Sequence, residues 1–406
     1  MLDSLRSVIS FRPIEWDRVT RALSRAANVE DLRGLARRRL PSGVFDYIDG
    51  AAEDERSLAD ATAAFARIGF SPRVLRDVSA IDTTTTLFGR TLPFPVVLSP
   101  TGFSRIADPQ GELAVARAAR RANLSYTLST MATRSIEEVR SVSDGDLWFQ
   151  VYVWRDRALV ASMLERAAAA GYSTIVITVD TAVLGRRERD VRRGFTLPPK
   201  IGLDTILSGA LKPSWTAAFV RAEPIVFANM ATSGTGVGDG STAVNLAQYI
   251  NSQFDPALSW ADIDWFRRQW KGRVVIKGIQ SVADARLAVE HGVDAIALSN
   301  HGGRQLDGAP APIDLVAPVA DAVGGSVTIL CDGGVRRGSD IVKALALGAD
   351  AVMIGRAYLY GLGAAGERGV DHVLQFLQEG MTRTMALCGA ASVKELDRDL
   401  IAARIR

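Results

Sequence analysis

Residues 273–299, RVVIKGIQSVADARLAVEHGVDAIALS, carry the pattern that decides the fold. The runs 273–277 and 295–299 are rich in β-branched and other apolar residues, which is typical of buried strands. Between them, SVADARLAVEHG repeats apolar residues at the i, i+3, i+4 spacing of an amphipathic helix. This stretch therefore predicts one strand–helix–strand unit of a parallel sheet.

The same alternation recurs from residue 93 onward. Further apolar runs predict strands at 96–99, 125–129, 147–151, 174–179, 327–330 and 351–354. Helical spacing recurs in GELAVARAARRAN, RALVASMLERAAAAG and GSDIVKALALGA. Together with the first pair of strands there are eight strand–helix units. Eight such units close a (β/α)8 barrel, the TIM-barrel fold of the α/β class.

Three segments lie outside this rhythm. Residues 1–92 predict an N-terminal cap segment with a helix at 29–39, the barrel then occupies 93–390, and 391–406 form a C-terminal tail. Residues 181–259, between the fourth strand and its helix, form an insert loop much longer than an ordinary strand–helix connection. Its stretch ATSGTGVGDGST resembles a linker in composition. Loops of such length are usually functional lids or mobile segments.

Composition excludes several classes of protein. The 48 Lys and Arg residues against 45 Asp and Glu give a net charge of +3, too small to predict a nucleic-acid partner. No apolar run reaches the ~18 residues of a membrane span, and the N-terminus lacks a signal-peptide core. The two cysteines, Cys331 and Cys388, fit a reducing compartment, so a cytoplasmic location is expected.

Motifs of other cofactor sites are missing from the sequence. No GxGxxG opens a helix after the first strand, and no GxxxxGK[ST] occurs, so a Rossmann site and a P-loop are both disfavoured. The sequence also lacks HExxH and CxxC, so no metal site is predicted.

Polar residues follow the predicted strands, at the end of a barrel where active sites are built. In chain order they are Pro100, Thr101, Gly102, Ser129, Thr130, Gln150, Tyr152, Thr178, Asp180, Lys277, Ser299, Asn300, His301, Asp332, Gly333, Gly334, Gly355 and Arg356. Any one of them could be a turn or a helix cap, but their presence at all eight strand ends predicts a site.

Histidine and lysine are scarce enough to sort by position. His291 lies at a helix end and His372 on the last helix, so both are interpreted as structural, whereas His301 follows the sixth strand and is the candidate general base. Lys277 is the lysine that ends a predicted buried strand. A buried ammonium needs an anion or acceptor, so Lys277 is either a Schiff-base nucleophile or a fixed charge beside an anionic cofactor.

Four arginines predict anion binding. CDGGVRRGSD and MIGRAY place Arg336 and Arg356 with several glycines in the last two units, where barrels frequently bind a phosphate. Arg187 in LGRRERD and Arg304 in SNHGGRQLDG follow the fourth and sixth strands. Placed on one rim, these two guanidinium groups would clamp a carboxylate.

The sequence resembles the FMN-dependent enzymes that oxidise L-2-hydroxy acids. The resemblance runs from LPSGVFDYIDGAAEDE through SPTGF, FQVY, TVDT, LGRR, VIKG, SNHGGRQLDG and DGGVRRG to IGRAYLYGL, and covers most of the chain. Within that family, FDPALSWADIDWF is most similar to the bacterial L-lactate dehydrogenases.

The resemblance implies a role for each matched residue. His301 would take the substrate proton while the α-hydrogen passes to flavin N5, Asp180 would stabilise the imidazolium, and Tyr152 would hydrogen-bond the substrate oxygen. Arg187, Arg304 and the Tyr47 hydroxyl would bind the carboxylate, and Lys277 would face flavin N1. FMN would further be held by Pro100, Thr101, Gly102, Ser129, Gln150, Thr178 and Ser299 at the ring and ribityl chain, and by Asp332, Gly333, Gly334, Arg336, Gly355 and Arg356 at the ribityl chain and phosphate.

The resulting expectation is oxidation of an L-2-hydroxy acid, first of all L-lactate to pyruvate, with electrons passed to a quinone or another acceptor. An O2-using oxidase of glycolate or mandelate is the alternative, although Gly102 stands where the oxidases commonly have Ala, and Met131 where plant-type oxidases carry an aromatic residue. A non-redox barrel isomerase or aldolase using Lys277, and a flavin-binding scaffold without activity, are the more distant alternatives. The family also implies a homo-oligomer, a tetramer by habit, and leaves open a peripheral contact with the cytoplasmic face of a membrane through the 181–259 loop.

Overall fold

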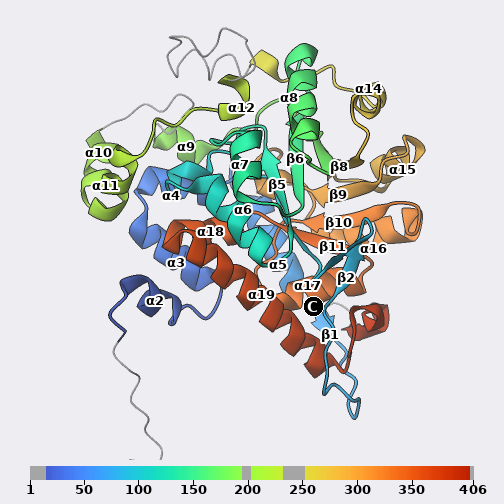
Figure 1. The fold of residues 1–406 in the computed structure, drawn as a ribbon. Helices are drawn as coiled ribbons and strands as arrows, with labels where there is room; N and C mark the ends of the chain where they lie inside the picture. Colours follow the sequence, from blue (N-terminus) through green and yellow to red (C-terminus); the bar gives the residue numbers. More distant parts are fainter. Residues whose placement is uncertain (1–14, 194–202, 232–251, 403–406) are drawn as a thin grey trace, which may run out of the picture.

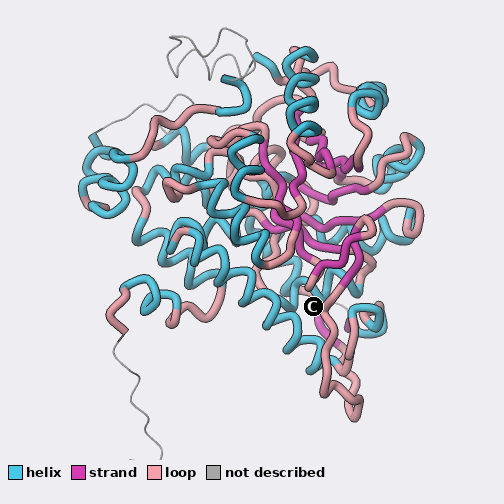
Figure 2. Tube along the Cα trace, in the orientation of Figure 1, coloured by secondary structure: helices cyan, strands magenta, loops and turns pink. Residues whose placement is uncertain are grey.

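The structure is a computed structural model, and it describes residues 15–193, 203–231 and 252–402. Eight parallel strands close a barrel at its centre (Figure 2). They follow one another around the barrel in chain order: β4 (Val96–Leu98), β5 (Ser125–Ser129), β6 (Leu147–Tyr152), β7 (Thr174–Thr178), β8 (Arg273–Ile279), β9 (Ala295–Ser299), β10 (Thr328–Asp332) and β11 (Ala351–Ile354). The predicted (β/α)8 fold is confirmed.

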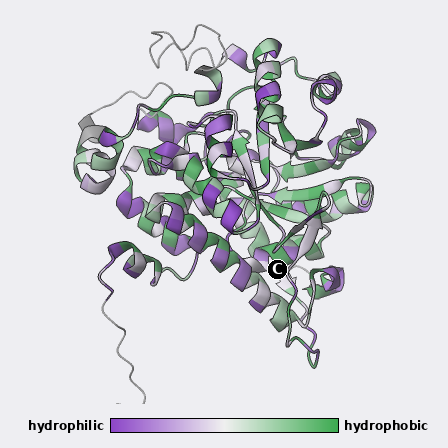
Figure 3. Cartoon of the chain, in the orientation of Figure 1, coloured by the Kyte–Doolittle hydropathy of each residue, from purple (hydrophilic) through white to green (hydrophobic). Residues whose placement is uncertain are grey.

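Helices cover the outside of the barrel (Figure 1). The helices that follow the strands are α6 (Gly111–Arg121), α7 (Ile136–Val142), α8 (Arg157–Ala169), α14 (Ala261–Gln269), α15 (Val282–Glu290), α16 (Pro312–Val323), α17 (Gly338–Ala346) and α18 (Arg356–Ala365). Every residue of β5, β7, β9 and β11 is buried, since helices pack against the strands from outside and side chains fill the inside. Figure 3 shows the strands as apolar and the outer helix faces as mixed.

The unit around β8 and β9 shows how the sequence produces these elements. Ser281 caps α15, because its hydroxyl accepts a hydrogen bond from the backbone of Asp284, and Gly292 follows the helix with a left-handed φ of 63°. β8 contains a bulge between Lys277 and Ile279, at which Gly278 adopts a φ of 111°.

The N- and C-terminal segments are built against the barrel. The helices α2 (Arg18–Leu23), α3 (Val29–Arg39), α4 (Ser42–Asp49) and α5 (Arg56–Ala66) precede the hairpin of β2 (Thr85–Leu87) and β3 (Arg90–Leu92). After the long α19 (Glu367–Cys388), β12 (Ile401–Ala402) pairs with β1 (Gly69–Phe70) in antiparallel fashion. The segment expected as a C-terminal tail thus returns to the N-terminal segment.

The long connection after β7 is partly helical. It contains α9 (Glu188–Arg192), α10 (Leu203–Ala210), α11 (Pro213–Arg221) and α12 (Ala228–Ala231). Almost all of the linker-like stretch ATSGTGVGDGST lies outside the described residues. Within the ranges that the structure describes, no helix is both long and apolar enough to span a membrane.

Candidate active site

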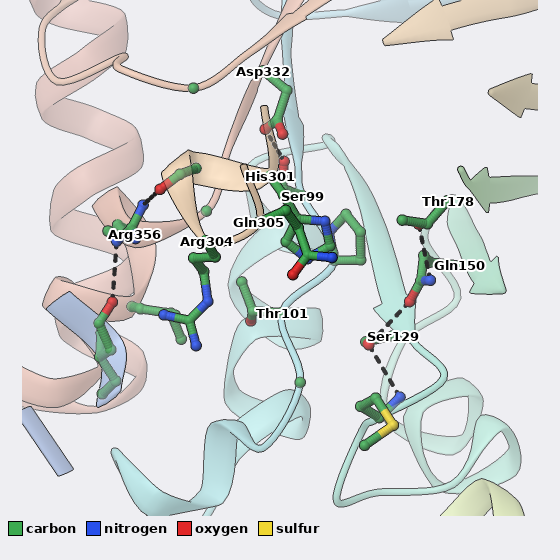
Figure 4. A pocket seen from close by; sticks show the side chains of 18 of the residues that line it. Ser99, Thr101, Ser129, Gln150, Thr178, His301, Arg304, Gln305, Asp332 and Arg356 are labelled. Atoms are coloured by element: carbon green, nitrogen blue, oxygen red, sulfur yellow. Dashed lines mark hydrogen bonds between the residues drawn. The ribbon is translucent and has the colours of Figure 1, made fainter. Parts of the chain in front are cut away.

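A pocket opens at the carboxyl ends of the barrel strands (Figure 4). It is lined by most of the residues predicted from the sequence: Tyr47, Pro100, Thr101, Gly102, Ser129, Gln150, Tyr152, Thr178, Arg187, Lys277, His301, Arg304, Asp332, Gly333, Gly334, Arg336, Gly355 and Arg356. Asp180 and Ser299 do not line it, but each hydrogen-bonds to a residue that does.

Lys277 lies at the floor of the pocket in a buried ion pair. Its Nζ is 2.7 Å from Asp332 Oδ2 and donates to Ser299 Oγ at 2.8 Å. Ser99 Oγ donates to the other oxygen of Asp332 at 2.5 Å. Burial acts to raise the pKa of Asp332, but the charge and hydrogen bond of Lys277 outweigh it and lower that pKa. An ammonium paired in this way favours the fixed-charge interpretation of Lys277 over the Schiff-base nucleophile.

A hydrogen-bonded row crosses three neighbouring strands beside Lys277. Gln150 Nε2 donates to Thr178 Oγ1 at 3.0 Å, and Gln150 Oε1 accepts from Ser129 Oγ at 3.1 Å (Figure 4). The backbone N–H of Thr130 also donates to Gln150 Oε1. These bonds fix which end of the amide is donor and which is acceptor, so the row can recognise the polar edge of a ring.

The opposite end of the pocket carries unpaired positive charge. Arg356 is partly buried, and its guanidinium donates to three backbone carbonyls, those of Ile48, Gly50 and Gly302, at 2.7–3.1 Å. Burial lowers the pKa of Arg356. In the described part of the chain it has no carboxylate within ion-pair distance. Because α18 begins beside Gly355, its N-terminal N–H groups add to a site suited to a phosphate.

His301 is joined to a buried carboxylate. Its Nδ1 is 2.8 Å from Asp180 Oδ1, and the Asp180 side chain is only 3% exposed. Gly278, at the bulge in β8, leaves room for this carboxylate, since a Cβ there would lie 2.8 Å from Asp180 Cβ. His301 itself adopts a left-handed φ of 57°, and its backbone N–H donates to Ser299 Oγ. With Nδ1 engaged by Asp180, Nε2 is the nitrogen left for a ligand in the pocket.

Two guanidinium groups lie over the ring of Tyr47. The distances from the guanidinium carbons of Arg304 and Arg187 to the ring centroid are 5.0 and 5.4 Å. Arg304 is fixed by hydrogen bonds to the carbonyls of Tyr47 and Gly50 at 2.8 and 3.0 Å. Burial, and then the charge of Arg187, lower the pKa of Arg304 to about 10, which leaves it cationic at neutral pH. The pair predicted from separate motifs is therefore brought together, in an arrangement suited to a carboxylate.

Aromatic rings form the remaining wall. Phe103 lies 5.5 Å from Phe227 and Phe254 lies 5.3 Å from Tyr152, measured between ring centroids. Burial raises the pKa of Tyr152, so its hydroxyl stays protonated and can donate a hydrogen bond. Met131 and Leu184 also line the pocket. This wall can receive an apolar substituent.

Several of these residues were not predicted. Ser99 holds Asp332, Gln305 Nε2 donates to the backbone carbonyl of Asp180, and Phe227 and Phe254 come from the long connection. Ser99 ends a predicted strand, so the strand-end rule could have found it. The two phenylalanines carry no signal of their own, because their place depends on the path of the connection.

Comparisons with known proteins place this geometry in context. Residues 36–403 match the family model described as FMN-dependent dehydrogenase. The chain is 44% identical to a putative L-lactate dehydrogenase of Mycobacterium tuberculosis over 97% of its own length and 93% of the relative's. It is 42% identical to the glycolate oxidase of Spinacia oleracea, with 93% and 95% of the two chains covered. A crystal structure of a monotopic membrane protein, (S)-mandelate dehydrogenase, superposes with a TM-score of 0.88 at 41% identity and covers 93% and 99% of the two chains.

Proposed function

The chain belongs to the FMN-dependent dehydrogenase family, and from this premise we propose that it oxidises L-lactate to pyruvate. The observation that carries the proposal is the joint placement of an Arg187–Arg304 pair and a His301–Asp180 pair in one pocket. A cationic clamp beside a general base is what a 2-hydroxy acid requires, because its carboxylate and its hydroxyl are on adjacent carbons.

The residues present fit FMN. The partly buried Arg356, which lacks a carboxylate partner in the described chain, and the start of α18 suit the phosphate. The oriented amide of Gln150 and the hydroxyl of Thr178 suit the polar edge of the ring. Lys277 supplies a fixed positive charge at the floor. When bound, FMN supplies the two-electron acceptor for the α-hydrogen of the substrate.

The chain's own residues would carry the proton and position the substrate. Arg187 and Arg304 would hold the carboxylate, and Tyr152 would donate to the substrate oxygen. His301 would take the hydroxyl proton at Nε2, and Asp180 would stabilise the imidazolium that results through its contact with Nδ1. Lys277 would balance the negative charge that accumulates on the cofactor side during reduction.

A second candidate substrate is (S)-mandelate. The aromatic wall of Phe103, Phe227 and Phe254 favours it, because a phenyl substituent would gain ring contacts that a methyl group cannot make. The similarity to (S)-mandelate dehydrogenase is consistent with this candidate.

An anaerobic visible spectrum of the purified holoenzyme tests the function. We expect the flavin bands to bleach on addition of L-lactate but not of D-lactate, with glycolate and L-mandelate run in parallel. Faster bleaching by L-mandelate, which is the (S) enantiomer, than by L-lactate would make mandelate the preferred substrate. No bleaching by any of the four acids would contradict the proposed class of substrate. Hydrogen peroxide formed in step with each turnover in air would favour the oxidase alternative.

We further propose that the enzyme passes its electrons to a membrane quinone while docked on the cytoplasmic face. The helical hairpin of α10 and α11 exposes Leu207, Leu211 and Val220, which are 64%, 77% and 75% exposed. Lys212 Nζ donates to the Arg38 carbonyl, which places this hairpin beside α3 and its exposed Arg37. Apolar side chains next to basic ones are suited to an anionic bilayer surface.

Co-sedimentation with phosphatidylglycerol vesicles tests the docking surface. The double variant Leu207→Glu/Leu211→Glu should bind these vesicles at least several-fold more weakly than the wild type, with unchanged reduction of the flavin by substrate. Leu387→Glu, at a position that is 72% exposed on α19, is the matched control. Equal vesicle binding by the double variant and the wild type would contradict the proposal that this hairpin docks on the membrane. The homo-oligomer, expected as a tetramer, is checked in the same preparations by light scattering.

A further inference from the structure

Asp190 is a buried carboxylate beside the guanidinium pair of Arg187 and Arg304, and it takes no part in the proposed reaction. It lies on the short α9, three residues after Arg187, with a side chain that is 8% exposed. Its Oδ2 is 3.0 Å from Arg187 Nε, and this oxygen has no hydrogen-bond partner in the described chain. A buried carboxylate oxygen without a hydrogen bond is costly, so its place next to a ligand-binding arginine points to a task there.

A second ion pair on the same helix shows what an ordinary surface pair looks like. Glu188 and Arg192 are 36% and 69% exposed and face solvent. Asp190 instead faces the buried side of α9. Burial raises the pKa of Asp190, opposed by the charges of Arg187 and Arg304, while Asp46 and Glu55 add to the rise. Asp190 is therefore part of the electrostatic surroundings of both arginines.

The two arginines are held differently. Arg304 is anchored by two backbone carbonyls, which belong to the fold and do not depend on any other side chain. For the side chain of Arg187, the partners in the described chain are the Tyr47 ring at 5.4 Å and the carboxylate of Asp190. Arg187 precedes the first turn of α9, on the long connection after β7. Its position therefore depends on Asp190 far more than that of Arg304 depends on any one side chain.

We propose that Asp190 is a positioning residue that holds Arg187 in place to receive the carboxylate of the substrate. This inference rests on the proposed function, since it assumes that Arg187 binds that carboxylate. The carboxylate of a 2-hydroxy acid keeps its charge throughout the oxidation, so its contact with Arg187 is equal in the ground state and the transition state. Loss of such a uniform contact raises KM and leaves kcat nearly unchanged.

The test measures binding and reduction separately on the holoenzyme. Pyruvate is titrated against the visible spectrum of the oxidised flavin to give a Kd without turnover, and anaerobic stopped-flow with L-lactate gives the limiting rate of reduction. In Asp190→Ala we expect about a ten-fold rise in the Kd of pyruvate and in KM, with a limiting rate within about two-fold of the wild type. Glu188→Ala, on the same helix, should leave all three quantities unchanged. Asp190→Asn keeps the side-chain volume and one oxygen acceptor, so its Kd for pyruvate should rise by about three-fold. If Asp190→Ala does not fold, the Kd of Asp190→Asn tests the positioning role.

A double-mutant cycle separates positioning from a general structural effect. In an Arg187→Met background, Asp190→Ala should cause no further rise in the Kd of pyruvate, because the side chain that it positions is gone. An unchanged Kd in both Asp190 variants, an equal rise with and without Arg187, or a fall in kcat with KM unchanged would each overturn the inference. A wild type that binds pyruvate but is not reduced by any 2-hydroxy acid would instead overturn the proposed function, and the cycle on pyruvate binding would still report on Asp190.

Discussion

The floor and the rim of the pocket are built in different ways. The floor, which we define as the lining residues Ser99, Gln150, Lys277 and Asp332 together with Ser299, which bonds to two of them, consists of side chains on or directly after barrel strands. These residues hydrogen-bond to one another or to the next strand. The rim, which we define as Tyr47, Arg187 and Arg304, comes from α4, the start of α9 and the segment after β9. Its charges are held by ring contacts, carbonyls and one carboxylate.

The difference separates a rigid half of the site from an adaptable half. On the floor, Lys277 is held by Asp332 in a buried ion pair, so the position of its charge is fixed before any ligand binds. On the rim, the one ion pair that the two guanidinium groups make within the described residues is that of Arg187 with Asp190, so positive charge is left over for an anion. A cofactor that stays bound suits the first arrangement, and a substrate that must enter and leave suits the second.

The largest expected effect concerns His301, which stands between floor and rim. His301→Gln removes the base but keeps a side chain that can hydrogen-bond, so reduction of the flavin by L-lactate should slow by roughly 10³-fold or more while FMN stays bound. Stopped-flow reduction and the flavin content of the purified variant measure the two quantities. His372→Gln is the control, because His372 contacts the Ala26 carbonyl on the outer helices. Reduction of the flavin at the wild-type rate in His301→Gln would show that His301 is not the general base.

Apart from Ser99, the floor could be predicted from the sequence, and the rim only in part. Strand ends follow from periodicity, and in a barrel all carboxyl ends meet, so Gln150, Lys277 and Asp332 fell into one site without further information. The contact between Arg304 and Tyr47 joins residues 257 positions apart and depends on how the N-terminal segment packs on the barrel.

Two residues around the rim, Asp190 and Phe227, escaped prediction for a related reason. Asp190 and Phe227 belong to the long connection, whose short helices give too few turns for a clear period. Only the family resemblance named Tyr47 as a binding residue, and no pattern in the sequence distinguished Asp190 from its charged neighbours in LGRRERD.

A smaller effect is expected from breaking the floor. Lys277→Met leaves Asp332 buried without its cation, which costs roughly 3–5 kcal/mol, and removes the charge that faces the cofactor. FMN should therefore be retained more weakly and reduced more slowly, as measured by equilibrium dialysis and stopped-flow. Lys343→Met is the matched control, since Lys343 is a half-buried lysine that donates to the Phe65 carbonyl outside the pocket.

A second substitution separates the two causes. Asp332→Asn added to Lys277→Met removes the stranded charge, so it should restore stability but not the rate of reduction. Retention and reduction of FMN by Lys277→Met at wild-type levels would contradict the fixed-charge role. Restoration of the rate by Asp332→Asn would show that Lys277 acts only on folding.

The smallest effect concerns Asp49, the residue that ties the rim to the barrel. It accepts hydrogen bonds from Arg33, Arg189 of α9 and Tyr360. Burial acts to raise the pKa of Asp49, but the bonds from Arg33 and Tyr360 outweigh it and lower that pKa to about 2. A depressed pKa in the folded state contributes stability at pH values above the ordinary aspartate pKa of 3.8, and this contribution is lost as the pH falls towards about 2.

Asp49→Asn should therefore lower the free energy of unfolding by about 2 kcal/mol at neutral pH, and by much less near pH 2, as followed by urea unfolding. Asp54→Asn, at an exposed pair with Arg56, should change neither value, and a loss in Asp49→Asn that is the same at both pH values would show that the charge of Asp49 does not hold the rim.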